Sequence, residues 1–126
     1  MDIAIRSYAL IALFMLLTAV PVLAADVPVD VELVLAVDVS GSMDRDEQQV
    51  QRDGYVEAFR HADVLSAIRA GVTGKIAVTY IEWAGPQNQT VVVPWTVIDG
   101  ADAGRKFSDT LAAAPISRFR GTSISG

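Results

Sequence analysis

Hydrophobic positions after residue 30 fall into short continuous runs and longer periodic stretches, which predicts that strands and helices alternate. Residues 32–38 form a nearly continuous apolar run that ends on Asp38, as is typical of a strand buried on both faces of a parallel sheet. Residues 75–83 and 89–95 predict two further strands. The link between these two is too short for the crossover of about a dozen residues that a parallel pair needs, so we expect an antiparallel hairpin at the sheet edge.

Apolar residues spaced three and four apart predict three helices. Acidic residues crowd the start of the first helix, just after Met43, where the helix dipole favours them. Arg52 is expected to lie mostly outside the apolar stripe of this helix. Asp63 is the expected N-cap of a second, short helix, and a third covers residues 103–114, where Pro115 stops it. The expected stripe of the first helix is Val50, Gly54, Tyr55, Ala58, Phe59 and Ala62.

The segment before residue 25 has the pattern of a secretory signal peptide. A short head that carries Arg6 precedes an apolar run over residues 9–20, and Pro21 ends this run. Ala24 supplies the small residue at the expected cleavage position, and Ala25 is the alternative. We therefore expect an exported protein, periplasmic or extracellular.

A transmembrane anchor is the alternative interpretation of the apolar run. A spanning helix needs about 20 apolar residues, whereas Thr18 and Pro21 interrupt a shorter run here. The expected organisation is thus a signal peptide over residues 1–24, a lead-in over 25–30 and one domain over 31–126, without a stable membrane span after cleavage. A parallel-sheet domain with helices on both faces usually needs somewhat more than 126 residues, so we expect this domain to be incomplete.

Charge and cysteine content exclude two kinds of site. The formal net charge is −5 and no Lys/Arg cluster is visible, which argues against a nucleic-acid partner, because neutralising phosphates needs a basic stripe. The chain contains no cysteine, which excludes disulfides and thiolate metal sites. Any bound metal would be held by oxygen.

The segment Asp38-Val39-Ser40-Gly41-Ser42 is the most informative chemical feature. It places a carboxylate at the end of a buried strand and two hydroxyls in a tight turn before a helix, and ligands of open α/β sheets bind beyond such strand ends. A carboxylate with hydroxyls suits a hard cation such as Mg²⁺. The alternative is that Ser42 or Asp44 only caps the following helix.

These residues resemble the metal-ion-dependent adhesion site of the von Willebrand factor type A family, which opens with Asp-x-Ser-x-Ser after the first strand. Gly121-Thr122 resembles the segment that supplies the threonine ligand of that family, and the resemblance covers residues 31–126. A narrower similarity is to a bacterial exported branch, the domain of unknown function DUF1194. It rests on residues 37–43, 82–85, 93–96 and 121–125.

The resemblance implies a doubly wound, mostly parallel sheet with an antiparallel edge hairpin. It implies that Ser40, Ser42 and Thr122 coordinate Mg²⁺, or Mn²⁺ or Ca²⁺, directly, while Asp38 acts through water and orients the serines. Such an ion could accept a carboxylate from a protein partner. The last acidic ligand of the family follows its fourth strand, and no such strand is present in this sequence.

Glu82, Gly41 and Gly121 are possible supporting residues around the site. Glu82 should lie at the same sheet edge as Asp38, as a group behind the ligands or simply as a solvated strand end. Trp83 and Trp95 are expected to pack against a helix.

Catalytic interpretations find less support in the sequence. Neither Ser40 nor Ser123 lies in a Gly-x-Ser-x-Gly nucleophile elbow, and His61, the one histidine, is expected on the surface of the first helix. Residues 71–75 lack the spacing of a phosphate loop. The alternatives to a binding module are a Mg²⁺-dependent hydrolase, for which Glu82 is a distant candidate base, and a structural protein with an unused metal motif.

Overall fold

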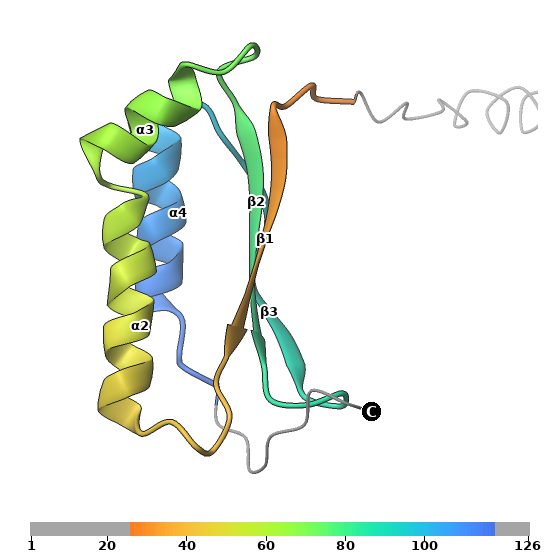
Figure 1. The fold of residues 1–126 in the computed structure, drawn as a ribbon, viewed down its shortest axis with the longest axis vertical. Coiled ribbons are helices and arrows are strands. Elements are labelled where there is room, and N and C mark those ends of the chain that lie inside the picture. Colours follow the sequence, from red (N-terminus) through yellow and green to blue (C-terminus); the bar gives the residue numbers. More distant parts are fainter. Residues whose placement is uncertain (1–25, 118–126) are drawn as a thin grey trace, which may run out of the picture.

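The computed structural model describes residues 26–117, and these form an α/β fold with one mixed sheet and three helices. The strands are β1 (Val31–Asp38), β2 (Ile76–Trp83) and β3 (Gln89–Ile98), in the order β1-β2-β3. β1 and β2 are parallel, whereas β2 and β3 are antiparallel (Figure 1). The predicted hairpin is therefore confirmed, and β3 continues past Pro94 to Ile98, further than the sequence pattern predicts.

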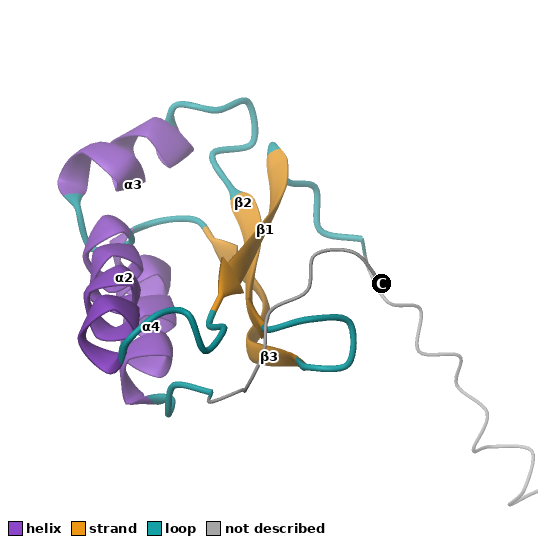
Figure 2. Ribbon diagram, turned by 60° about the horizontal axis from the view of Figure 1, so that its bottom comes forward, coloured by secondary structure: helices purple, strands orange, loops and turns teal. Residues whose placement is uncertain are grey.

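The described residues contain three helices. Helices α2 (Arg45–Ala58) and α3 (Ala62–Arg69) lie between β1 and β2, and α4 (Ala101–Ala113) follows β3, in the order that the sequence predicts. All three lie on the same face of the sheet (Figure 2). Within residues 26–117 the sheet is thus covered on one face only. The α/β class is confirmed, and the doubly wound arrangement stays a prediction.

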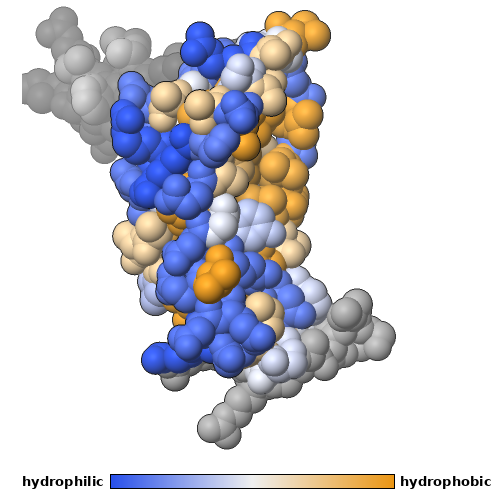
Figure 3. Space-filling model, turned by 60° about the vertical axis from the view of Figure 1, so that its left-hand side comes forward, coloured by the Kyte–Doolittle hydropathy of each residue, from blue (hydrophilic) through white to orange (hydrophobic). Residues whose placement is uncertain are grey.

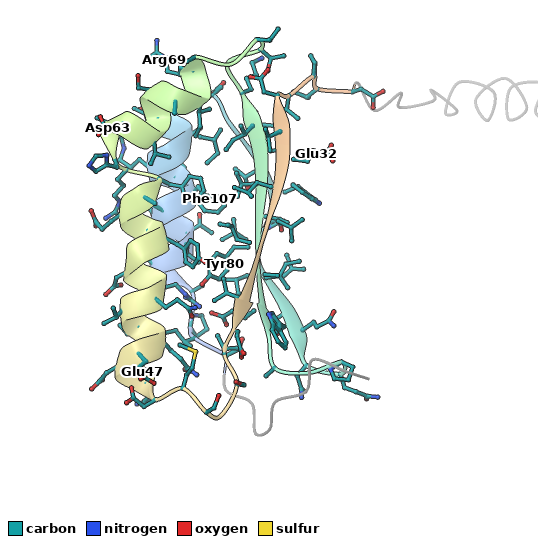
Figure 4. All side chains as sticks on the ribbon, viewed as in Figure 1. Glu32, Glu47, Asp63, Arg69, Tyr80 and Phe107 are labelled. Atoms are coloured by element: carbon teal, nitrogen blue, oxygen red, sulfur yellow. The ribbon has the colours of Figure 1, made fainter. Side chains whose placement is uncertain are left out.

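The hydrophobic core lies between the helices and the covered face of the sheet. Tyr80 and Phe107 point into this layer from β2 and α4, whereas Glu32 points to the opposite side of the sheet (Figure 4). Other fully buried members are Val78, Ile98 and Leu111. This layer fixes the helices against the strands and so determines where the loops at the strand ends lie.

The prediction that β1 is buried on both faces is wrong for the described residues. Its side chains alternate: Leu35 and Val37 face the core, whereas Val34 on the opposite face is 51% exposed. Trp95 is 53% exposed, so its expected packing against a helix is also wrong. Hydrophobic residues gather along the right-hand side of the space-filling view, beside a mostly polar helical surface (Figure 3).

The apolar stripe predicted for α2 needs correction. Val50 is 72% exposed and Gly54 is also exposed, whereas Arg52, expected elsewhere, is only 2% exposed. Two members of the predicted stripe are confirmed, because Phe59 is buried and Tyr55 packs against the core. The buried residues within α2 itself are Gln48, Arg52 and Val56, which are spaced four apart. The sequence pattern missed Gln48 and Arg52 because both are polar, and the partners of Arg52 lie far along the chain.

His61, and not Asp63, is the N-cap of α3. The Nδ1 atom of His61 accepts a hydrogen bond from the backbone N–H of Asp63 at 3.3 Å. The His61 side chain is 64% exposed, which confirms the expected surface position although the residue lies between two helices.

Candidate metal centre

The carboxyl ends of β1 and β2 meet at one edge of the sheet. Asp38 lies beside Trp83 in the parallel register, and Val37 lies beside Glu82. The backbone N–H of Val39 donates to the carbonyl of Trp83 at 3.0 Å, which extends the pairing one residue into the loop. The sequence correctly predicts that Asp38 and Glu82 reach the same edge.

The loop after β1 brings Asp38, Ser40 and Ser42 together. The backbone N–H of Ser40 donates to Oδ1 of Asp38 at 2.7 Å, and the hydroxyls of Ser40 and Ser42 lie 3.0 Å apart. A further backbone bond, Met43 N–H to the carbonyl of Ser40 at 3.1 Å, closes the turn. Ser40 is fully buried, whereas Ser42 is exposed. One short turn thus gathers a carboxylate and two hydroxyls.

Asp44 caps helix α2 without help from either serine. Its Oδ1 accepts the backbone N–H of Glu47 at 2.8 Å, and its own backbone N–H donates to Oε2 of Glu47 at 2.9 Å, which completes a capping box. The alternative that Ser42 serves as this cap is therefore wrong, and Asp44 fills that role. The two serine hydroxyls bond to each other and are not used by the helix terminus.

The side chain of Gln48 ties the loop to α2. Its Nε2 donates to the carbonyl of Val39 at 3.3 Å, and the residue is 8% exposed. This bond and the capping box hold the loop between a strand end and a helix start. The position of the serine hydroxyls is thereby set by ordered backbone on both sides.

The donor set fits a hard divalent cation. Carboxylate and hydroxyl oxygens are ligands that Mg²⁺ accepts, and Mg²⁺ keeps several waters when few protein ligands are offered. Within residues 26–117 no group of three or more His, Asp or Glu side chains is placed to hold a metal, so a site here would depend on the hydroxyls. Thr122, Gly121 and the cleavage residue Ala24 lie outside the described residues.

Glu82 is not a solvated strand end. It is 1% exposed and forms an ion pair with Arg52 of α2. Its other oxygen, Oε2, accepts the backbone N–H of Ser117 at 2.9 Å. Glu82 therefore joins β2 both to α2 and to the segment that follows α4.

Arg52 completes this buried cluster. Its Nη1 donates to the carbonyls of Leu111 at 3.0 Å and Ala114 at 2.7 Å, at the end of α4. Its Cζ lies 5.7 Å from the ring centroid of Tyr80, within reach of a cation–π contact. Burial raises the pKa of Tyr80 to about 12, although the charge of Arg52 opposes this shift.

Sequence reasoning missed the roles of Arg52 and Ser117. One signal was present: Arg52 lies four residues from both Gln48 and Val56, on the stripe that proves to be buried. A single arginine on such a stripe indicates a buried partner of opposite charge. No local pattern identifies Ser117, because its bond to Glu82 joins residues 35 positions apart.

Comparison with known proteins gives one match. A family model described as "Protein of unknown function (DUF1194)" matches residues 28–126, which is most of the chain. The comparisons with curated proteins and with solved structures found no match. Among the described residues, no helix has both the length and the apolar character needed to cross a membrane.

Proposed function

This chain belongs to the DUF1194 family, and from that premise and the geometry of the loop after β1 we propose that it is a metal-dependent protein-binding module. The observation that carries the proposal is the turn that gathers Asp38, Ser40 and Ser42 while Asp44 alone caps the helix. The helix terminus uses none of these three side chains, which supports a role for them in binding a ligand.

Ser40, Ser42 and Thr122 would hold a Mg²⁺, Mn²⁺ or Ca²⁺ ion, and Asp38 would keep the serines oriented. The bond from Ser40 N–H to Asp38 Oδ1 supports this division of roles, because it fixes the turn from which both hydroxyls project. Hydroxyl ligands are neutral, so a bound ion would keep much of its charge and could attract a carboxylate of a partner protein. Binding a protein through such a carboxylate is the proposed function.

The fold supports the same interpretation at a coarser level. A parallel pair, β1 and β2, places the loop at the carboxyl end of the sheet, where open α/β sheets bind ligands. We extend this to a doubly wound sheet of the von Willebrand factor type A kind, supported by the exposed apolar face opposite the helices. The signal-peptide pattern before residue 25 supports export to the periplasm or the cell exterior.

The surroundings of Glu82, the candidate base of the hydrolase alternative, support binding more than hydrolysis. Glu82 accepts hydrogen bonds on both carboxylate oxygens, from Arg52 and from the backbone of Ser117. A general base must lie within hydrogen-bond reach of the proton it takes, whereas Glu82 is 1% exposed and is paired with the positive charge of Arg52. Within the described residues this arrangement favours binding over hydrolysis.

Titration with Mn²⁺ tests the proposed metal site. We expect the full chain to bind Mn²⁺, detected by electron paramagnetic resonance of the free ion, and we expect Asp38→Ala to abolish this binding. The physical reason is that the variant removes the charge opposite the cation and the acceptor that fixes the Ser40 backbone.

Asp44→Ala is the matched control, because it removes a carboxylate from the same loop that serves as a helix cap. It should leave Mn²⁺ affinity unchanged while lowering the free energy of unfolding by about 1 kcal/mol. Equal Mn²⁺ binding by wild type and Asp38→Ala would refute the assignment.

A further inference from the structure

The peptide unit that joins Val39 to Ser40 is held at both of its polar ends. Its carbonyl oxygen, on Val39, accepts a hydrogen bond from Nε2 of Gln48 at 3.3 Å. Its N–H group, on Ser40, donates to Oδ1 of Asp38 at 2.7 Å. Because a peptide unit is planar, its C=O and N–H groups can turn only together. The bond from Gln48 therefore also sets the direction of the N–H group that reaches the Asp38 carboxylate.

The first residue of the loop is bound from both sides, where the chain crosses from the sheet to the start of α2 (Figure 1). The backbone N–H of Val39 donates to the carbonyl of Trp83 at 3.0 Å, so β2 holds one side of this residue. Gln48 of α2 holds the other side through the carbonyl. Val39 is 2% exposed, so water has little access to replace either bond, and leaving one of them unmade would be costly.

The side chain of Gln48 reaches the loop from a fixed position. It is 8% exposed and belongs to the buried stripe of α2. One turn further along this helix, Arg52 forms a buried ion pair with Glu82, which lies beside Val37 in the parallel register. This pair fixes α2 against the strand ends from which the loop leaves. The distance between Gln48 and the Val39 carbonyl is thereby determined by the packing of α2 on the sheet.

We propose that Gln48 is a positioning residue, which fixes the Val39–Ser40 peptide unit and through it directs the Asp38 carboxylate and the Ser40 hydroxyl toward a bound cation. Without Gln48 the peptide unit could turn, which would break the bond from Ser40 to Asp38. Ordering both side chains would then cost part of the binding free energy. This inference rests on the proposed metal-binding function, and it adds a residue that the Asp-x-Ser-x-Ser motif does not contain.

The decisive variant is Gln48→Met in the full chain. Methionine has a similar length and volume but no N–H group, so it removes the donor while it keeps a buried side chain at this position. We expect Mn²⁺ affinity to fall by roughly tenfold, the size of effect seen when groups behind metal ligands are changed. Gln48→Leu, a second apolar replacement, should give a similar loss, so the test does not depend on how one side chain packs.

Two control variants lie on the same helix. Gln49→Met makes the same chemical change at the neighbouring residue, whose Nε2 donates to Oδ1 of Asp53 on the exposed surface at 2.8 Å, and it should leave Mn²⁺ affinity unchanged. Val56→Ala controls for loss of stability, because Val56 is 5% exposed on the same stripe as Gln48. It should lower the urea midpoint without changing Mn²⁺ affinity. An equal loss of affinity in Val56→Ala would overturn the positioning role.

Hydrogen exchange of the Ser40 amide, followed by NMR without metal, separates failure of this inference from failure of the metal site. This amide should exchange faster in Gln48→Met than in wild type and in Gln49→Met. If wild type binds no Mn²⁺, the proposed function fails, and the exchange measurement alone decides whether Gln48 fixes the peptide unit. An unchanged Ser40 exchange rate, or full Mn²⁺ affinity in both Gln48 variants, would contradict the inference.

Discussion

Asp30, just before β1, organises the turn between α3 and β2. Its carboxylate accepts the backbone N–H of Thr73 at 2.8 Å and that of Lys75 at 3.3 Å. The hydrogen bond from Thr73 is the main cause that lowers the Asp30 pKa below the ordinary value of 3.8. Residues 71–75, which superficially suggest a phosphate loop, thus form a turn bound to a carboxylate of the chain itself.

The stability supplied by Asp30 should depend on pH. A lowered folded-state pKa means that the carboxylate stabilises the fold above about pH 3.8 and that this stabilisation is lost as the pH falls through the folded-state value. We expect Asp30→Asn to lower the urea midpoint at pH 7 and to differ less from wild type as the pH falls below the folded-state pKa of Asp30. A difference between the two proteins that stays constant over this pH range would contradict the assignment.

The loop after β1 shows how far residue-level reasoning reaches. Asp38, Ser40 and Ser42 could be selected from the sequence because strand end, turn and helix start follow one another along the chain. The sequence left open whether Ser42 or Asp44 caps α2, since both lie close to the first turn. Geometry resolves this, because only Asp44 exchanges bonds with Glu47.

At the scale of elements, Gly104 of α4 packs against Phe59, the C-cap residue of α2, and against Leu65 of α3. A Cβ atom at this position would lie 2.5 Å from the carbonyl oxygen of Phe59 and 2.8 Å from a methyl group of Leu65. The first neighbour is backbone and can move only if a helix moves. A glycine that weakens α4 locally is therefore needed for α4 to pack against the end of α2 and against α3.

Two Gly→Ala substitutions test this packing, and they should change the unfolding free energy in opposite directions. Gly104→Ala should lower the unfolding free energy by about 1–3 kcal/mol, because the clash outweighs the better helix propensity. Gly54→Ala, on exposed α2 surface with no atom within 4 Å of the added Cβ, should raise it by about 0.5–1 kcal/mol. Chemical denaturation measures both. A stabilising Gly104→Ala would show that the helices separate readily.

Element types were predictable, whereas the buried face of α2 was not. Continuous apolar runs identified the strands, and a short link identified the hairpin. The stripe of α2 includes Arg52, whose burial is offset by the ion pair with Glu82 and by the hydrogen bonds that it donates to carbonyls at the end of α4. Partners so distant in sequence leave no local pattern.

At the scale of the whole molecule, the sheet has two unlike faces in the described residues. Val78 on the helical face is fully buried, whereas Val34 on the other face is 51% exposed. The sequence predicted burial on both faces because Val and Leu fill β1 without alternation. The apolar composition of a strand shows that both of its faces can be buried. It does not show whether another layer of the fold covers each face.

Two separate Val→Thr variants, one on each face of the sheet, measure this difference in burial. Val34→Thr should change the unfolding free energy by less than about 0.5 kcal/mol, since the added hydroxyl reaches water. Val78→Thr has the same shape change and should cost about 1–3 kcal/mol, because its hydroxyl would be buried without a partner. A large loss for Val34→Thr that grows with protein concentration would reveal self-association through this face.

The guanidinium of Arg52 also has a consequence for the order of folding. Helix α4 has no basic residue in its own last turn, and the carbonyls of Leu111 and Ala114 receive their positive charge from α2. The final turn of α4 therefore gains its stabilising partner only after α2 has docked. The end of one helix thus depends on the packing of another, so we expect the last turn of α4 to fray wherever α2 is not docked.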